Sequence, residues 1–254
     1  MTAQLTKIFR HPIKSHGVEA LKKVTLSPGQ TMPWDRRWAV PHEAADIAGP
    51  GSEWKPCNLF SRGAKTAALM ALRAHLDPRG KILTLTHPDL DDLTFWPDAP
   101  GDSARFLDWL RPLNNTSRAR PVGIVRARDR GMTDTDFPSL SILSERSLSE
   151  LSHRAGQDLS PLRFRGNLWI DGLPPWEEFD LVGQTIRIGS TLLRVREIIG
   201  RCRATGVNPT TGAPDVDTLG LLQQAYGHTN FGVYAEVLEG GALSLGDPVS
   251  IESA

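Results

Sequence analysis

The chain has 254 residues, which is enough for one large domain or two modest ones. Its 29 basic and 29 acidic side chains give a formal net charge of zero at pH 7, so we expect no nucleic acid and no membrane surface as a partner. No run of about eighteen apolar residues occurs, which argues against a membrane-spanning helix.

Two cysteines, Cys57 and Cys202, are too few for a disulfide framework and fit reduced thiols. The N-terminus has no apolar segment of the kind that a secretory signal needs, so we expect a cytoplasmic protein. The 19 prolines and 23 glycines predict many turns and short strands rather than a bundle of helices.

The first predicted strand is Leu5–Arg10, and a second runs over Leu21–Leu26. Lys14 and Ser15 follow the first strand with a cation and a hydroxyl, which suit either a phosphate group or a solvated surface. Arg36 precedes an aromatic and apolar strand. From the residues alone it is interpreted as part of a surface charge pair on a strand.

The middle of the chain carries weaker signals. His42–Lys55 predicts an exposed loop, and Cys57 has no cysteine or histidine at metal-binding spacing, so we interpret it as structural. Lys65–Leu76 is ambiguous, because helix-forming residues lead into a turn and a strand. Asp102–Leu110 has one apolar face and is followed by Pro112, which predicts a short helix.

Pro121–Arg126 predicts a strand, and the polar segment Arg128–Asp136 predicts a loop near a domain junction. Arg126, Arg128 and Arg130 of this region suit either a solvated face or a basic rim around an acidic cofactor or partner. Ser144–Arg154 predicts a helix, with a capping box formed by Ser147 and Glu150 and a glycine that closes it.

Arg163–Ile170 alternates polar and apolar residues, which predicts a strand. Its polar positions Arg163, Arg165 and Asn167 would then share one face. Such a row indicates either a solvated sheet edge or a surface that binds an anion.

Two short strands, over Gln184–Gly189 and Leu192–Ile199, precede Cys202, and a turn signal follows it. Cys202 is therefore expected where a strand ends and a loop begins. The flanking Arg201 and Arg203 favour the thiolate, which is both a nucleophile and a soft metal ligand. A buried and inert cysteine is the alternative.

A helix over Asp215–Tyr226 and a strand over Asn230–Val237 follow. The residues that carry chemistry are thus one thiol with arginines, a lysine and an asparagine from distant parts of the chain. A cofactor that bears both a phosphate and a metal would need anion anchors and a soft ligand of this kind. No zinc pattern, phosphate-binding Walker loop or dinucleotide fingerprint competes with this interpretation.

The segment from Arg201 to Gly212 resembles the signature of the MOSC domain, in which an Arg-Cys pair precedes a Val-Asp-Pro-x-Thr-Gly turn. Thr205 stands at the threonine position, and Asn208 replaces the usual aspartate. Gly241–Val249 resembles the segment that closes the same domain, so the two motifs together are specific. MOSC domains occur in molybdenum cofactor sulfurases and in amidoxime-reducing components.

Other stretches resemble the amidoxime-reducing group. Phe9–Ser15 is similar to a motif of its N-terminal β-barrel domain, and the resemblance favours a hairpin for Lys65–Leu76. Trp54–Phe60 departs from the family pattern, which leaves the substrate side of the site open. The resemblance implies contacts with a molybdopterin cofactor for Lys14, Ser15, Arg36, Asp136, Arg165, Asn167, Arg201 and Thr205.

The resemblance implies a mainly β fold with some α-helix, in which residues 1–125 form an N-terminal β-barrel-like domain and residues 126–254 the MOSC β-barrel. It also implies the molybdenum cofactor (Mo-molybdopterin), with Cys202 as both metal ligand and catalytic residue. The expected function is an oxidoreductase that reduces small N-hydroxylated compounds with electrons from an external donor protein. The alternative is a non-catalytic carrier of the molybdenum cofactor or of sulfur.

Overall fold

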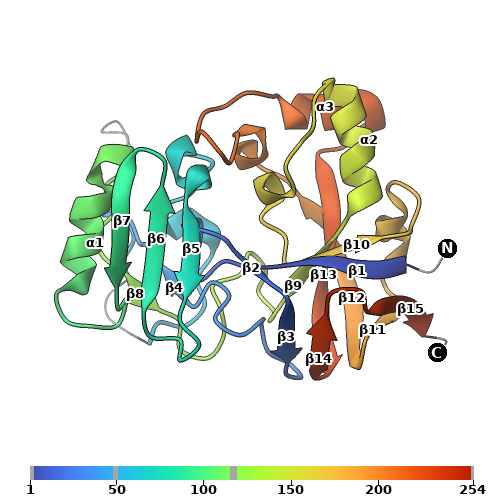
Figure 1. The fold of residues 1–254 in the computed structure, drawn as a ribbon, viewed down its shortest axis with the longest axis horizontal. Helices are drawn as coiled ribbons and strands as arrows, with labels where there is room; N and C mark the ends of the chain where they lie inside the picture. Colours follow the sequence, from blue (N-terminus) through green and yellow to red (C-terminus); the bar gives the residue numbers. More distant parts are fainter. Residues whose placement is uncertain (1–2, 48–50, 115–118, 253–254) are drawn as a thin grey trace.

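A computed structural model describes residues 3–47, 51–114 and 119–252. The described chain is mainly β, as expected, with three α-helices: α1 (Asp102–Leu110), α2 (Glu145–Ala155) and α3 (Thr218–Tyr226). None of the described helices is long and apolar enough to cross a membrane. Figure 1 shows two lobes, with α2 and α3 beside the larger sheet and α1 beside the smaller one.

The larger lobe is a closed β-barrel. Its strands are β1 (Ala3–Arg10), β2 (Glu19–Leu21), β9 (Leu140–Ser144), β10 (Leu168–Asp171), β11 (Thr185–Ile188), β12 (Thr191–Gly200), β13 (Asn230–Glu239) and β15 (Pro248–Glu252). They pair in the order β10-β9-β13-β12-β11-β15-β1-β2, and an added pairing of β1 with β10 closes seven of them into a ring. Closure leaves no free edge within that ring.

Apolar and polar side chains alternate along the barrel strands, so the apolar ones point into the barrel. Leu5, Ile142, Ile186, Val195 and Val233 are fully buried and belong to one core cluster. β9 and β10 run parallel, whereas the other barrel pairs are antiparallel. The barrel therefore provides a rigid frame whose strand ends can carry a site.

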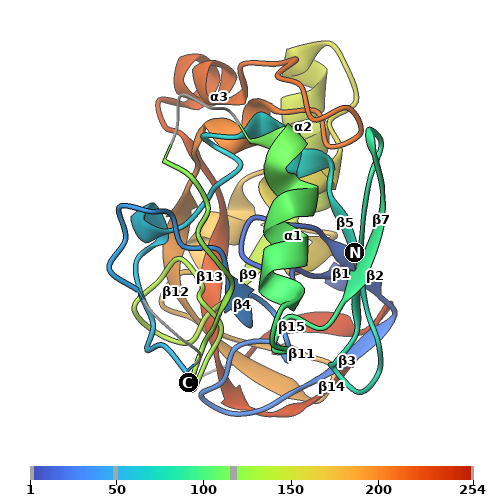
Figure 2. The same ribbon diagram turned by 90° about the vertical axis from the view of Figure 1, so that its left-hand side faces the viewer.

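The smaller lobe contains an antiparallel sheet of β5 (Arg73–Leu76), β6 (Leu83–His87) and β7 (Leu90–Phe95). Figure 2 shows α1 in front, with this sheet beside it. Phe95 and Phe106 stack with their ring centroids 5.4 Å apart, which joins the sheet to α1.

Two small sheets link distant parts of the chain. β3 (Lys23–Leu26) pairs with β14 (Gly241–Ser244), and β4 (Trp38–Ala39) pairs with β8 (Val125–Arg126). Together with the pairing of β1 to β10, these contacts join the first half of the chain to the second. The division into residues 1–125 and 126–254 stays a prediction.

Several local predictions are confirmed, and others need correction. The helix over Asp102–Leu110 has the predicted bounds, and Gly156, at φ 66°, closes α2 as expected. The N-cap of α2 is Ser144, whose side chain accepts from the Ser147 backbone, so the capping box at Ser147 and Glu150 is wrong.

Two further segments differ from expectation. A 3-10 helix over Ala67–Ala71 precedes β5, so the hairpin begins at Arg73 rather than at Lys65. Asp217 caps α3 by accepting from the Gly220 backbone, so this helix begins at Thr218 instead of Asp215. In both cases hydrogen bonds that the periodicity does not show set the start of the element.

The predicted strand over Arg163–Ile170 is wrong in its first half. Pro161–Phe164 forms a 3-10 helix, Arg165 has φ 48°, and β10 begins only at Leu168. Proline at the first turn favours a helical start, and a residue with positive φ breaks the alternation of a strand. The polar side chains therefore do not share one sheet face.

Candidate functional site

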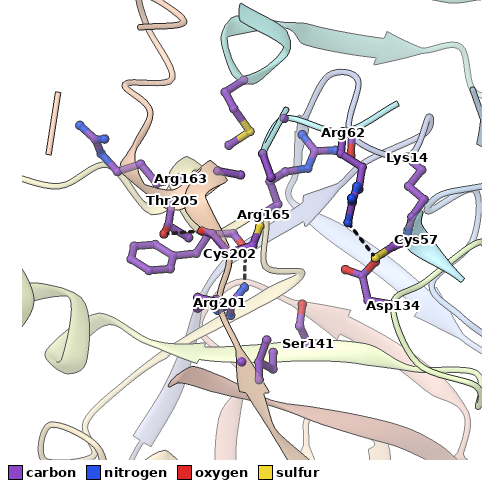
Figure 3. A pocket seen from close by; sticks show the side chains of 18 of the residues that line it. Lys14, Cys57, Arg62, Asp134, Ser141, Arg163, Arg165, Arg201, Cys202 and Thr205 are labelled. Carbon is purple, nitrogen blue, oxygen red and sulfur yellow. Dashed lines mark hydrogen bonds and ion pairs between the residues drawn. The ribbon is translucent and has the colours of Figure 1, made fainter. Parts of the chain in front are cut away.

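A cavity of about 240 Å³ collects side chains from segments far apart in the sequence (Figure 3). Its walls come from the chain after β1, the segment between β4 and β5, the loop before β10, and the loop after β12. The charged and sulfur-bearing lining residues are Lys14, Arg36, Cys57, Arg62, Met70, Asp134, Arg163, Arg165, Arg201 and Cys202.

Cys202 lies where the sequence predicted it. β12 ends at Gly200, and Cys202 is extended immediately before the 3-10 helix Arg203–Gly206. Its thiol is exposed and faces the cavity, so the alternative of a buried, inert cysteine is wrong. The Thr205 hydroxyl lies 3.0 Å from the Cys202 carbonyl oxygen, to which it donates, and 2.6 Å from the Thr218 hydroxyl. Thr205 therefore fixes the loop that presents the thiol.

Arg201 lies beneath the same loop. It donates from Nη1 to the Phe164 carbonyl and from Nε to the Phe231 carbonyl, both at 2.8 Å. Its guanidinium also lies 5.6 Å from the Phe164 ring and 5.9 Å from the Phe231 ring. Burial lowers the pKa of Arg201 to about 10. Arg201 thus holds the loops together and leaves its positive charge next to Cys202.

Lys14 is buried, and its Nζ donates to the Met132 carbonyl at 2.7 Å and to the Asp134 carboxylate at 2.5 Å. Partial desolvation opposes ionisation of Asp134, whose side chain is 47% exposed, yet the charges of Lys14 and Arg36 hold its pKa below the ordinary value. The sequence prediction named Asp136 for this position, but Asp136 does not line the cavity. The loop has no periodicity, so its pattern cannot show which of the two carboxylates faces inward.

Arg36 lies in a buried network on the cavity floor. Its Nη1 forms an ion pair with the neighbouring Asp35, and its Nη2 donates to the Arg165 carbonyl at 2.9 Å. The Asp35 carboxylate also accepts from the His11 backbone at 2.7 Å. Burial and the nearby arginines lower the pKa of His11 to about 3, so that ring is neutral at pH 7. Arg36 therefore positions Arg165 and has few donors left for a ligand.

Arg165 is half-buried and, unlike Arg36 and Arg163, pairs with no described carboxylate. Within the described residues its side chain makes one hydrogen bond, from Nη2 to the Gly17 carbonyl at 3.2 Å, and no carboxylate forms an ion pair with it. Burial, and then the charge of Arg36, lower the pKa of Arg165 to about 9. A desolvated guanidinium with free donors is a receptor for an anion.

Backbone strain concentrates at this cavity. Five described non-glycine residues have positive φ, and three of them, Ser15 at 65°, Arg36 at 50° and Arg165 at 48°, line it. Such conformations persist only where the surrounding structure enforces them, and they cluster at functional sites. Ser15 lies beside Lys14 in the cavity lining, and its predicted contact with a cofactor stays a prediction.

Asn167 does not line the main cavity. It accepts from the Ser141 backbone and hydroxyl, both at 3.1 Å, and donates to the Phe9 carbonyl at 3.2 Å. These bonds tie β9 and β1 together below the cavity, next to a small polar recess that Asn167 helps to line. Asn167 therefore supports the floor, and Ser141 is the neighbour that reaches the cavity.

The lining also includes residues that sequence reasoning did not assign to the site, among them Cys57, Arg62, Asp134 and Tyr234. Cys57 was interpreted as structural, but it faces the cavity, and Arg62 Nη1 lies 3.5 Å from its sulfur. Burial raises the pKa of Tyr234, so its hydroxyl stays protonated at pH 7. No motif marks these positions, because each reaches the cavity through tertiary packing.

The lining is strongly cationic. Six cationic side chains line the cavity against one carboxylate, and the cations are Lys14, Arg36, Arg62, Arg163, Arg165 and Arg201. Arg163 is neutralised from outside the lining by a bidentate pair with Asp215, at 2.7 Å for both bonds. The described residues contain no group of three or more His, Cys, Asp or Glu side chains able to hold a metal ion. The surplus of positive charge suits a ligand that carries negative charge.

Comparison with known proteins shows which sequences and folds this chain is similar to. Residues 130–250 match the family model of the MOSC domain. The chain is 31% identical over 126 residues to mitochondrial amidoxime-reducing component 1 of Xenopus laevis, which covers 45% of this chain and 36% of that protein. It is also 31% identical over 152 residues to molybdenum cofactor sulfurase of Drosophila grimshawi, which covers 57% of this chain and 19% of that protein.

The aligned region thus spans little more than a third of the amidoxime-reducing component and about a fifth of the molybdenum cofactor sulfurase. Among solved structures, the YUAD protein from Bacillus subtilis has a similar fold, with a TM-score of 0.51 and 16% identity. That similarity covers 100% of this chain and 97% of the other. Residues 130–250, whose loop after β12 carries Cys202, therefore match a MOSC domain.

Proposed function

We propose that this protein is a molybdenum-cofactor-dependent oxidoreductase that reduces N-hydroxylated compounds with electrons from a separate donor protein. One observation carries the proposal: the exposed Cys202 thiol and the Arg165 guanidinium, which pairs with no described carboxylate, face the same cationic cavity. The thiol is a soft ligand, and the guanidinium is an anion receptor. The likeness to an amidoxime-reducing component supports the reaction class.

The residues present fit such a cofactor. Arg165 is desolvated, has free donors, and forms no ion pair with a described carboxylate, so an anionic group would relieve the cost of its burial. Lys14 and Ser15 would hold the same end of the cofactor, and Cys202 would bind the metal. When bound, the cofactor would supply two-electron chemistry that removes an oxygen atom from the substrate.

The side chains around the cavity prepare this reaction. Thr205 donates to the Cys202 carbonyl and Arg201 donates to the Phe164 carbonyl, and these bonds fix the loop that presents the thiol. In the net reaction of an amidoxime, the N–O bond breaks and the oxygen leaves as water. Two electrons come from the donor protein and two protons come from solvent, which yields the amidine.

Metal analysis tests the proposal. The protein is purified from a host that makes the cofactor, and its molybdenum content is measured together with its reduction of an aryl amidoxime. We expect close to one molybdenum per chain and formation of the amidine with a chemical or protein electron donor. Protein that is folded but free of molybdenum, in a host proven competent, would refute the proposal.

A second candidate is a non-catalytic carrier of the molybdenum cofactor or of sulfur. The exposure of Cys202 supports it, because a carrier needs an accessible thiol, and so does the likeness to a molybdenum cofactor sulfurase. Bound cofactor without reductase activity, or a persulfide on Cys202 detected by mass spectrometry, would favour this second function.

A further inference from the structure

Arg62 is a cation in the cavity for which the proposed cofactor site gives no role. Within the described residues its side chain makes one polar contact, from Nη1 to the Cys57 sulfur at 3.5 Å, and no carboxylate forms an ion pair with it. It is half-buried and faces the cavity together with Cys202 (Figure 3). Arg62 therefore keeps donors and a positive charge for a ligand.

The backbone around Arg62 is held in place. Its carbonyl accepts from the Lys65 and Thr66 backbones, both at 2.9 Å, which closes a turn. Gly63 follows in a tight contact, because a Cβ there would lie 2.6 Å from the Met70 sulfur and 3.7 Å from the Ala204 Cβ. The segment that carries Arg62 thus packs against the Cys202 loop. The backbone of Arg62 is therefore fixed near the thiol.

The other arginines of the cavity are held by hydrogen bonds or ion pairs within the protein. Arg36 pairs with Asp35, Arg163 pairs with Asp215, and Arg201 donates to two carbonyl oxygens. Arg165 is fixed through Arg36 at the floor. Arg62 instead follows Cys57, in a part of the cavity wall to which no cofactor motif of the sequence was assigned.

We propose that Arg62 is a specificity residue that selects N-hydroxylated substrates carrying a carboxylate. Its planar fork of donors matches a carboxylate in a bidentate arrangement. The carboxylate would bind away from the N–O bond, so Arg62 contributes to substrate binding and not to the electron transfer. This inference rests on the proposed reductase function and adds the substrate class.

The test uses the molybdenum-loaded protein and two matched substrates: an aryl amidoxime and the same compound with a para-carboxylate. Arg62→Gln should raise KM for the carboxylated substrate by at least roughly tenfold, the loss expected for a charge-assisted hydrogen-bond pair. The KM of the neutral amidoxime and the molybdenum content should stay unchanged. Arg62→Glu should weaken binding of the carboxylated compound further.

The control is Arg111→Gln, which removes the same charge from an exposed arginine directly after α1 on the smaller lobe. An equal effect of Arg62→Gln on both substrates would overturn the inference. So would a fall in molybdenum content, because Arg62 would then hold the cofactor. A wild-type protein that reduces neither amidoxime refutes the reductase function itself. In that case calorimetry with the para-carboxylated amidine still decides: weaker binding in Arg62→Gln supports the anion receptor, and unchanged binding overturns it.

Discussion

Replacing Arg165 by glutamine should stabilise the cofactor-free protein while it weakens the binding of anions. The half-buried guanidinium forms no ion pair with a described carboxylate, and its pKa falls from its ordinary value to about 9. At about 1.4 kcal/mol for each tenfold change, this lowering corresponds to an unfavourable charge interaction on the order of 5 kcal/mol. Solvent in the open cavity screens part of it, so we expect a gain of about 1 to 3 kcal/mol.

The lowered pKa of Arg165 also determines how the effect of Arg165→Gln on stability depends on pH. Because the folded pKa of Arg165 lies below the unfolded one, the unfolded chain binds more protons above about pH 9. The cost of the buried charge is therefore fully present below that pH and decreases as the pH rises through it. The stability difference between wild type and Arg165→Gln should shrink in the same range.

Urea denaturation of the cofactor-free protein measures the effect, with Arg111→Gln as the matched control. Thermal unfolding in increasing inorganic phosphate gives the second readout, because an anion that binds only the folded state raises Tm. Phosphate should raise the Tm of wild type more than that of Arg165→Gln. A destabilised Arg165→Gln, or equal phosphate effects on both proteins, would refute the reasoning.

Three further substitutions test separate parts of the site. Cys202→Ser should remain folded, because the thiol is exposed, but should lose reductase activity; wild-type activity in this variant would exclude the ligand role. Asp35→Asn should cost about 3 to 5 kcal/mol in urea denaturation, because it leaves the Arg36 charge buried without its partner, whereas exposed Asp108→Asn should change stability by less than about 0.5 kcal/mol. Asp134→Asn should remove stability that wild type has above the ordinary pKa of an aspartate and loses as the pH falls through the depressed pKa. The two proteins should therefore converge in acid, and a constant difference down to low pH would contradict the Lys14 pairing.

The sequence by itself determined the elements whose signals are local. Helix α1 follows from its apolar face and from Pro112, and the end of β12 before Cys202 follows from alternation and the turn after it. Lys14, Ser15, Arg36, Arg165, Arg201, Cys202 and Thr205 were predicted for the site, and all of them line the cavity. The local elements are predictable because neighbouring residues encode caps and turns, whereas the cofactor contacts of these residues stay a prediction.

Only the tertiary structure decided what each side chain does there. Barrel closure and lobe packing bring Arg62 to the Cys202 loop, and no local pattern encodes that contact. The choice of Asp134 over Asp136 depends on where the buried Lys14 ammonium finds a partner. The roles of Arg36 and Arg165 separate in the same way, because Asp35 neutralises the first and leaves the second exposed to a ligand. A buried charge takes its function from its partners, and these partners come from distant parts of the chain.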